Sequence, residues 1–332
     1  MQTDILNLFR RQGGEYLSGE EISRQLHVSR TTIWKHIRTL KQQGYDIEAH
    51  TRKGYRLRQI TDRLLPAEIA AGLQTRLLAA QTERIHHFNT VESTNNVAKK
   101  MAFDGCPAGT VIVSEEQGGG RGRLSRGWFS PNGKGIWMSV ILRPPFAPME
   151  APKCTLMAAV AVCRGIEKSV GVSCGIKWPN DILWQGKKMV GILTEMSAEM
   201  DAINHVVIGI GINVNIDADD FPEEIRPLAT SLSLVTGGQV ARLELLIAVL
   251  QELEDLYGRV LSDGFMPVLD EWRSRSATLG QKVDVYGPDR TFNGEAVDID
   301  EDGALLVKTA AGMIRVMAGD VSIRSKMLAE PQ

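Results

Sequence analysis

A segment of glycines and arginines at positions 118–128 carries the most specific chemistry in this chain of 332 residues. It reads Gly-Gly-Gly-Arg-Gly-Arg-Leu-Ser-Arg-Gly-Trp and follows an apolar stretch. Glycine lets the backbone approach a ligand closely, and guanidinium groups donate paired hydrogen bonds to phosphate oxygens. Arg121, Arg123 and Arg126 therefore predict a site for a phosphate-bearing ligand. Trp128 is placed either to stack on a purine or to anchor the loop, and a flexible solvated loop is the alternative.

Two common nucleotide-binding motifs are excluded at this loop. A dinucleotide fingerprint that begins at Gly120 would need its third glycine at position 125, which is Ser125. A Walker A loop that ends at Gly133-Lys134 would need a following serine or threonine, and it would need a glycine at position 128. Both are missing. The loop therefore belongs to neither the Rossmann class nor the P-loop class.

A second group combines a cation, an aromatic ring and two polar side chains around a rigid bend. Residues 177–181 read Lys-Trp-Pro-Asn-Asp, and Lys188 precedes an apolar run at 189–193. A lysine at the edge of a core is unfavourable unless its ammonium group meets an anion. Lys188 therefore predicts a carboxylate or a phosphate nearby. Asn180 and Asp181, taken alone, are also typical of a turn.

Hydroxyl and amide side chains form a third group. Ser93, Thr94 and Asn95 follow an expected strand, where they are placed either to cap a helix or to bind a small polar ring.

Residues 209–213 read Gly-Ile-Gly-Ile-Asn, which would let a ligand lie against bare backbone. The pair at 86–87, two histidines, has no partner at metal-ligand spacing. We interpret this pair as structural and expect no metal site built from side chains.

The chain around these groups alternates strands with helices. Residues 61–82 are expected to form a helical connector, and helices are expected at about 94–103, 152–170 and 241–262. Strands are expected at about 84–91, 110–115, 136–142, 175–178, 181–185, 188–195 and 205–215. From Gly280 onward, four short alternating strands separated by turn residues predict a small β-barrel of about 50 residues. Those strands are expected at 281–286, 291–298, 304–309 and 313–318.

The first 60 residues predict a winged helix-turn-helix. Apolar residues near the start indicate a first helix, Ser18 begins a capping box for a second helix, and Ser29 can cap a third. Residues 45–57 alternate around a turn, as a hairpin does. A packing module with an ordinary charged surface is the alternative. The residues expected to contact DNA are Ser29, Arg30, Thr31, Thr32, Lys35, Arg38, Arg52 and Lys53.

Charge is distributed unevenly along the chain. Residues 1–60 hold 11 Lys/Arg and 6 Asp/Glu, whereas the other residues hold 27 and 34. A basic head on an acidic body is expected when only the head binds nucleic acid. The 4 cysteines show no C-x-x-C spacing, and no apolar run reaches the roughly 18 residues of a membrane span. We therefore expect a cytoplasmic protein that does not enter a membrane.

These motifs, in this order, resemble the bifunctional biotin protein ligase and biotin operon repressor family of bacteria. The resemblance covers nearly the whole chain and is most specific at the Gly-Arg-Gly-Arg loop and at residues 177–181. One departure is Ser125, which stands where many members carry glycine. The resemblance implies an α+β multidomain chain with a winged helix-turn-helix at 1–62, a catalytic domain at 63–279 and an SH3-like β-barrel at 280–326. The catalytic domain would be a mixed α/β fold similar to class II aminoacyl-tRNA synthetases and lipoate ligases.

The resemblance also implies roles for individual residues, with Lys188, Arg123 and Arg121 as the catalytic residues. Biotin would be bound by Ser93, Thr94, Asn95, Gln117, Gly120, Arg121, Gly122, Arg123, Lys188, Gly191 and Gly209. ATP, with Mg²⁺ on its phosphates, would be bound by Arg123, Arg126, Trp128, Lys177, Asn180, Asp181 and Asn213.

The implied activity joins biotin to AMP and then to a lysine of a biotin carboxyl carrier protein. The implied regulation is repression of biotin synthesis and transport genes, with biotinyl-AMP as corepressor and a homodimer bound to operator DNA. Three alternatives stay open. The chain is a ligase for lipoate or another acyl acid, a ligand-sensing repressor without ligase activity, or a ligase whose head no longer binds DNA.

Overall fold

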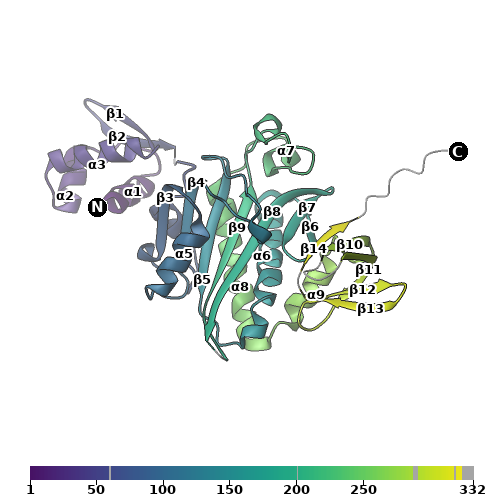
Figure 1. Cartoon of the computed structure of the whole chain (residues 1–332). Coiled ribbons are helices and arrows are strands. Elements are labelled where there is room, and N and C mark those ends of the chain that lie inside the picture. Colours follow the sequence, from purple (N-terminus) through teal and green to yellow (C-terminus); the bar gives the residue numbers. More distant parts are fainter. Residues whose placement is uncertain (60, 200, 287–290, 318, 324–332) are drawn as a thin grey trace. The chain divides into compact units, whose positions relative to one another are not determined.

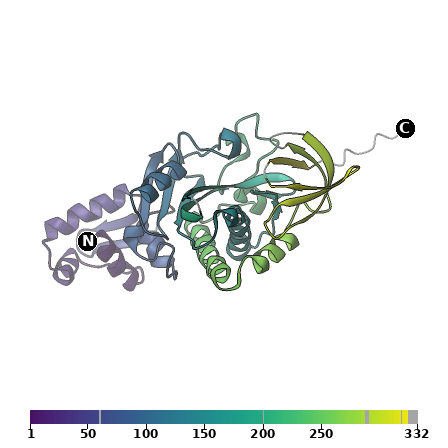
Figure 2. The same ribbon diagram turned by 60° about the horizontal axis from the view of Figure 1, so that its bottom comes forward.

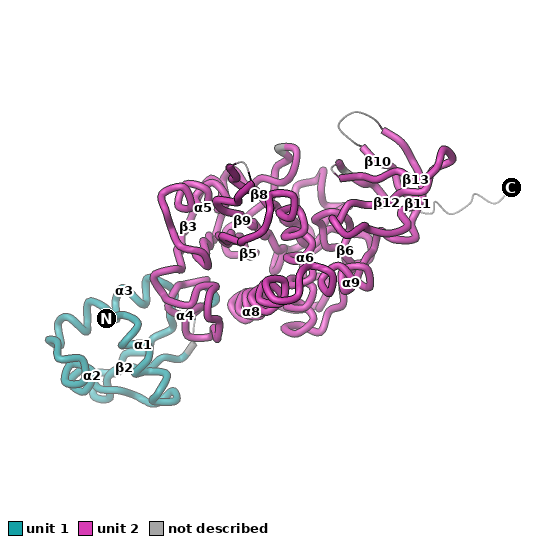
Figure 3. Tube along the Cα trace, turned by 90° about the horizontal axis from the view of Figure 1, so that it is seen from below, with its two compact units in different colours: residues 1–63 teal, residues 64–332 magenta. Residues whose placement is uncertain are grey.

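A computed structural model describes residues 1–59, 61–199, 201–286, 291–317 and 319–323. The chain divides into two compact units, residues 1–63 and residues 64–332 (Figures 1 and 3). The catalytic and C-terminal segments thus lie in one compact unit. The division into three domains at 62/63 and 279/280 stays a prediction, and positions 324–326 of the third domain lie outside the described residues.

The first unit is a winged helix-turn-helix, as predicted. Its helices are α1 (Gln2–Arg11), α2 (Gly19–Leu26) and α3 (Arg30–Gln42), and its hairpin pairs β1 (Asp46–His50) with β2 (Gly54–Gln59). Ser18 and Ser29 cap α2 and α3 because each hydroxyl accepts a backbone N–H three residues later. Ile22, Ile33 and Leu40 are buried between the helices. The capping serines and the apolar periodicity therefore define this unit.

A seven-stranded mixed sheet organises the second unit, in the order β3-β4-β5-β9-β8-β7-β6. Only the β3–β4 pair is parallel among the described strands of this sheet. The strands are β3 (Ile85–Val91), β4 (Val111–Gln117), β5 (Gly135–Leu142), β6 (Gly175–Lys177), β7 (Asp181–Trp184), β8 (Lys187–Glu199) and β9 (Ala202–Asn213).

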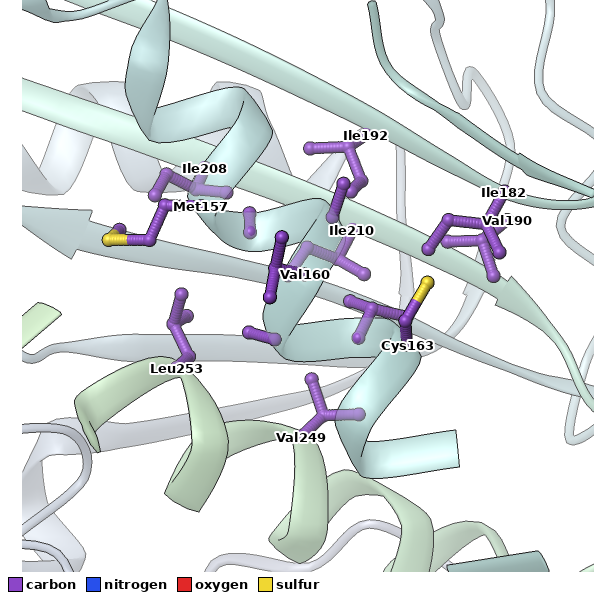
Figure 4. Close-up of a cluster of buried hydrophobic side chains, with 14 of the residues drawn as sticks. Met157, Val160, Cys163, Ile182, Val190, Ile192, Ile208, Ile210, Val249 and Leu253 are labelled. Atoms are coloured by element: carbon purple, nitrogen blue, oxygen red, sulfur yellow. The ribbon is translucent and has the colours of Figure 1, made fainter. Parts of the chain in front are cut away.

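Helices cover both faces of this sheet (Figure 2). Helix α5 (Thr94–Phe103) packs Ala98 and Ala102 on one face. Helices α6 (Lys153–Val170) and α8 (Arg242–Asp263) pack on the other and build the main apolar core (Figure 4), and α9 (Met266–Ser274) packs against these two helices. Gly165 of α6 lies against α8 so closely that a Cβ there would be 2.6 Å from Val249. The sheet is therefore covered on both faces by apolar contacts with helices.

Five antiparallel strands form the C-terminal sheet, in the order β13-β12-β11-β10-β14. They are β10 (Lys282–Tyr286), β11 (Thr291–Ile299), β12 (Leu305–Thr309), β13 (Gly312–Val316) and β14 (Asp320–Ile323). The fifth strand was missing from the sequence prediction. It is short, and its pairing with β10 is a long-range contact that no local pattern specifies. Val283, Val285 and Leu305 extend the core of the large sheet into this sheet.

The prediction of a helical connector at 61–82 was wrong over most of its length. Only α4 (Pro66–Gly72) and a turn of 3₁₀ helix at 82–84 are helical. Between them the backbone N–H groups of residues 76–78 donate to the carboxylate of Glu254 on α8, at 2.6–2.8 Å. A distant side chain thus satisfies donors that a helix would have satisfied locally. Helices α7 (Leu232–Thr236) and α9 were likewise not predicted.

Candidate functional site

The Arg-Gly loop connects β4 to β5 and is tied down at both ends. The N–H groups of Gly118 and Gly119 donate to the carbonyl oxygens of Val91 and Glu92, at 2.9 and 2.8 Å. At the other end, the N–H of Trp128 donates to the carbonyl of Gly120 at 2.8 Å. A Cβ at Gly120 would be 2.5 Å from the carbonyl oxygen of Trp128, so this position needs glycine. The loop therefore presents its arginines from a hydrogen-bonded base.

The ring of Trp128 lies on the backbone of β8 and β9, where both strands carry glycine. A Cβ at Gly211 would be 2.4 Å from the indole nitrogen, and one at Gly191 would be 2.9 Å from the ring. The indole N–H is buried and has no hydrogen-bond partner among the described residues. Gly211, predicted as bare backbone for a ligand, and Gly191, which the resemblance assigned to biotin, are thus covered by a side chain of the same chain.

Lys188 lies beside this ring and is paired with a carboxylate. Its ammonium nitrogen is 2.7 Å from Oδ1 of Asp181 and 5.1 Å from the centre of the Trp128 ring. The backbone of Lys188 is held by Leu228 and Thr230, at 2.7 and 2.9 Å. The anion expected near Lys188 is therefore supplied by the protein itself in this structure.

Arg123 bridges the loop to residues 177–181 and to the C-terminal sheet. It donates to Oδ1 of Asn180 at 3.4 Å and to the carbonyl of Gly319 at 2.9 Å. Asn180 is fixed in turn, because its amide donates to the carbonyl of Ile192 at 2.8 Å. Trp178 is 3% exposed and its indole N–H donates to the carbonyl of Gly303 at 3.0 Å, so its role is structural.

A pocket of about 210 Å³ opens at this bridge. It gathers the side chains predicted to bind ATP at 126, 177, 180 and 181, and it adds three residues of the C-terminal sheet. Those additions, Tyr286, Val321 and Ser322, had no motif in the sequence, because only the fold places β10 and β14 beside residues 177–181. The pocket has the mixed polar and aromatic lining that a nucleotide needs.

A chain of hydroxyl and amide groups lies at the start of α5. The side-chain carbonyl of Gln117 accepts the N–H and the hydroxyl of Thr94, at 2.9 and 3.2 Å. Ser139 of β5 donates to the hydroxyl of Thr94 and to Oδ1 of Asn95, at 2.8 and 2.6 Å. Ser93 holds the N-cap position without a capping hydrogen bond from its side chain. A Cβ at Gly209 would be 2.1 Å from Asn95, so that glycine admits the amide.

Acidic and basic side chains surround this hydroxyl chain. Glu195 accepts from Asn95 at 2.9 Å and pairs with Lys99 at 2.6 Å. Burial would raise the pKa of Glu195, but these two donors lower it overall. The exposed Arg121 donates to Oδ1 of Asn96. Sequence reasoning missed Lys99, Ser139 and Glu195. A serine inside the otherwise apolar β5 was the one available signal.

Two predicted residues form hydrogen bonds that fix the protein's own backbone. Asn213 is 4% exposed, and its amide donates to the carbonyl of Thr230 at 3.0 Å. Gly122 donates its N–H to the carbonyl of Arg126 at 2.7 Å, which shapes the loop. Their predicted ligand contacts stay predictions.

The winged head exposes the side chains that the sequence assigned to DNA. Arg30, Lys35 and Arg38 are exposed on α3, and the basic tip at 52–53 is exposed between β1 and β2. Thr31 is also exposed, whereas Ser29 and Thr32 share a hydrogen bond of 2.9 Å at the start of α3. Trp34, which was not predicted, is 52% exposed beside Arg38. The third helix and the hairpin tip thus each expose basic side chains of the kind that contact DNA.

The described residues hold no cluster of three or more His, Cys, Asp or Glu side chains with metal-ligand geometry. His87, interpreted from the sequence as structural, hydrogen-bonds the buried Glu115 at 3.1 Å, which agrees with that interpretation. In the part of the chain that the structure describes, no helix is long and apolar enough to cross a bilayer.

Comparison with protein-family models divides the chain in the same way as its motifs. Residues 87–213 match the biotin/lipoate A/B protein ligase family, residues 2–56 match a helix-turn-helix domain, and residues 278–324 match the biotin protein ligase C-terminal domain. The glycine-rich loop and residues 177–181 both lie inside the ligase match.

Individual relatives agree with these matches. The bifunctional ligase/repressor BirA of Bacillus spizizenii is 42% identical over 323 residues, which cover 97% of this chain and 98% of that one. The protein of the same name from Escherichia coli is 28% identical and covers 94% of each chain. A solved biotin protein ligase from Aquifex aeolicus, in complex with biotin and ATP, is 30% identical with a TM-score of 0.63, over 72% of this chain and 98% of that one. The chain therefore belongs to the bifunctional biotin ligase/repressor family.

Proposed function

We propose that this protein is an ATP-dependent biotin protein ligase that also represses transcription through its winged head. The observation that carries the ligase half is the convergence of the Arg-Gly loop and Lys188 on residues 177–181. Arg126 lines the pocket with these residues, Arg123 donates to Asn180, and Lys188 pairs with Asp181. The relatives named above join a ligase and a repressor in one chain of the same length, and the solved neighbour from Aquifex aeolicus binds biotin and ATP. The relatives and the solved neighbour named above support neither a lipoate-specific ligase nor a repressor that lacks ligase activity.

The hydroxyl chain at Thr94, Gln117 and Ser139 is the proposed site for the biotin ring. It offers fixed donors and acceptors next to the glycine at position 209, with ionised Glu195 behind them. The pocket at residues 177–181 is the proposed site for ATP, with Arg123 and Arg126 toward its phosphates. In this proposal Lys188, which pairs with Asp181 of this pocket, acts between the two ligands. This arrangement brings a carboxylate and the α-phosphate together at the lysine.

The first reaction joins two anions that repel each other until cations are fixed around them. The biotin carboxylate attacks the α-phosphorus, and pyrophosphate leaves. Lys188 exchanges Asp181 for the reacting oxygens and stabilises the charge that develops on them, with the loop arginines. In the second reaction a carrier lysine attacks the acyl carbon and AMP leaves. Catalysis is therefore positioning and electrostatic stabilisation.

Mg²⁺ enters with ATP as part of the substrate. Mg²⁺ bound to nucleotides takes most of its ligands from phosphates and water and only one or two from carboxylates. Asp181, released from Lys188, is the acidic side chain of the pocket that fits this limited role.

The repressor half uses biotinyl-AMP as corepressor. Ordering of the Arg-Gly loop around the intermediate is coupled to formation of a homodimer, whose two heads bind one palindromic operator. Sedimentation with and without biotinyl-AMP tests this coupling, and equal dimerisation in both conditions contradicts it. The cytoplasmic location stays a prediction, supported by four free cysteines.

Biotin-dependent exchange of pyrophosphate into ATP tests the adenylation step. We expect Lys188→Ala to lose about 2–4 kcal/mol of transition-state stabilisation, by analogy with removal of one oxyanion donor. The neighbouring Lys187 is exposed, so Lys187→Ala is the matched control and should exchange normally. Normal exchange in Lys188→Ala would contradict the assigned role of this lysine.

A further inference from the structure

Two cysteines outside the proposed ligand sites lie close enough to react with each other. Cys163 belongs to α6, and Cys174 lies in the turn that joins α6 to β6. Their sulfur atoms are 3.6 Å apart. Figure 4 shows Cys163 within the buried apolar cluster of α6 and the sheet. No step of the proposed reaction uses either thiol.

The two thiols differ in access and in acidity. Cys174 is 8% exposed and lines a pocket of about 600 Å³ with Ser173, Glu271 and Arg275, whereas Cys163 is 1% exposed. The hydrogen bond shared with Cys163 and the guanidinium of Arg275 lower the pKa of Cys174 against the effect of burial. The same hydrogen bond and burial raise the pKa of Cys163. Cys174 is therefore the thiol that an oxidant reaches first and that ionises more readily.

We propose that Cys163 and Cys174 form a reversible disulfide when a hydroperoxide enters this pocket. The thiolate of Cys174 attacks one oxygen of hydrogen peroxide, the O–O bond breaks, and one water leaves after protonation, which gives a sulfenic acid. The thiol of Cys163 then attacks that sulfur, and the second water leaves. Two thiols lose two electrons and two protons, and one peroxide becomes two waters.

Disulfide formation moves the segment that leads to the ATP pocket. The sulfurs must approach from 3.6 Å to about 2.05 Å, so the turn at 171–174 must shift. Gly175 cannot absorb this shift easily, because a Cβ there would be 2.8 Å from Ala277 and the next N–H donates to the carbonyl of Arg275 at 2.8 Å. The strand β6 ends at Lys177 in that pocket. Oxidation is therefore expected to raise the KM for ATP, a consequence that rests on the proposed function.

The disulfide itself is tested on the full-length protein by mass. Fully reduced protein is treated with hydrogen peroxide, its remaining thiols are alkylated, and trypsin is added. Cleavage after Lys153, Arg164, Lys168 and Lys177 separates the two cysteines into peptides 154–164 and 169–177. We expect these peptides to be linked, lighter than their sum by two hydrogens, and to separate after treatment with dithiothreitol.

Single variants identify the reacting pair. Peptide 154–164 also holds Cys154, a buried thiol whose pKa burial raises to about 12, so Cys154→Ser is the control that should still form the link. Cys106→Ser should also form it. Cys174→Ser should not, although its pyrophosphate exchange should equal that of the reduced wild type. Recovery of alkylated Cys163 and Cys174 after peroxide, or links from either residue to Cys106 or to a second chain, would overturn the proposal.

The effect on ATP has its own readout. Exchange is measured on reduced, oxidised and re-reduced protein, and we expect the KM for ATP to rise several-fold on oxidation and to recover on reduction. A linked protein with an unchanged KM would overturn the coupling between the disulfide and the ATP pocket. Absence of exchange in the reduced wild type would instead contradict the ligase function, since the disulfide is detected without activity.

Discussion

At the residue scale, Ser139 connects Thr94 to Asn95 within the hydroxyl chain. Its hydroxyl is fully buried in β5 and donates to both Thr94 and Asn95, which lie on α5. The geometry of both acceptors is thus set from the sheet beneath them. If Ser139 acts by positioning Thr94 and Asn95, its replacement should alter binding of the substrate that these two residues contact.

We expect Ser139→Ala to raise the KM for biotin about 10-fold and to leave the KM for ATP nearly unchanged. The reason is that the buried side chains of Thr94 and Asn95 lose a hydrogen-bond partner, which typically costs about 1–3 kcal/mol. Steady-state pyrophosphate exchange at varied biotin and varied ATP separates the two constants. Ser114 of β4 is equally buried and, among the described residues, its hydroxyl bonds the backbone of Glu116 on its own strand, so Ser114→Ala is the control. Equal changes in both KM values would contradict a specific role at biotin.

Residue types could be predicted from the sequence better than their partners. The arginines of the loop and the requirement of Lys188 for an anion follow from charge and spacing alone. Asp181 as that anion, at 2.7 Å, depends on how β7 and β8 pair, with a register shift between Ile182 and Leu183. Tertiary pairing of this kind leaves no local pattern, so contacts between motifs were found only in the structure.

At the scale of the elements, Glu115 connects β4 to Leu64 and to α8. It is 2% exposed on β4, accepts the N–H of Leu64 at 3.0 Å and pairs with Arg242 at the start of α8 at 2.9 Å. Burial would raise the pKa of Glu115, but the hydrogen bond from His87 and the charge of Arg242 lower it to about 2. The carboxylate is therefore ionised over the whole physiological range.

The lowered pKa of Glu115 predicts a pH dependence of stability. Because the folded pKa lies below the unfolded one, the stabilisation is present above about pH 4.5 and is lost as the pH falls toward 2. We expect Glu115→Gln to reduce the free energy of unfolding by about 3 kcal/mol at pH 7, as expected when one partner of a buried ion pair is removed. Chemical denaturation measures this difference.

The difference between wild type and Glu115→Gln should shrink as the pH is lowered from about 5 to 3. Glu116 is the next residue, and its pairing is weaker, with hydrogen bonds of 3.4 Å to Thr90 and Asn132. Glu116→Gln is therefore the control and should change stability little. A difference that stays constant with pH would exclude Glu115 as the titrating group.

Elements with strong periodicity could be predicted, and elements fixed by distant contacts could not. Helices α5, α6 and α8 have apolar faces long enough to indicate their position. The segment at 73–81 is held by hydrogen bonds to Glu254, and β14 is held by its pairing with β10. The conformation of each segment therefore depends on distant residues and not on its own sequence. Tertiary contacts decide the structure where local propensity is weak.

At the scale of the whole molecule, the proposed protein combines a ligase with a DNA-binding head. The salt dependence of DNA binding tests the role of that head. We expect Lys35→Ala to weaken operator binding and to reduce the slope of log affinity against log salt by about 1, because one phosphate contact is lost. Arg11 is exposed at the end of α1 and is not among the residues predicted to contact DNA, so Arg11→Ala is the control. An unchanged slope in Lys35→Ala would contradict a phosphate contact there.

Transfer of biotin to a carrier tests the central claim most directly. The purified protein is incubated with biotin, MgATP and a biotin carboxyl carrier domain, and the intact mass of the carrier is measured. The proposed function predicts a mass gain equal to biotin less one water, which requires both biotin and ATP and disappears when the acceptor lysine of the carrier is replaced by arginine. A carrier of unchanged mass after incubation with the protein, biotin and MgATP would contradict the assignment of this protein as a biotin ligase.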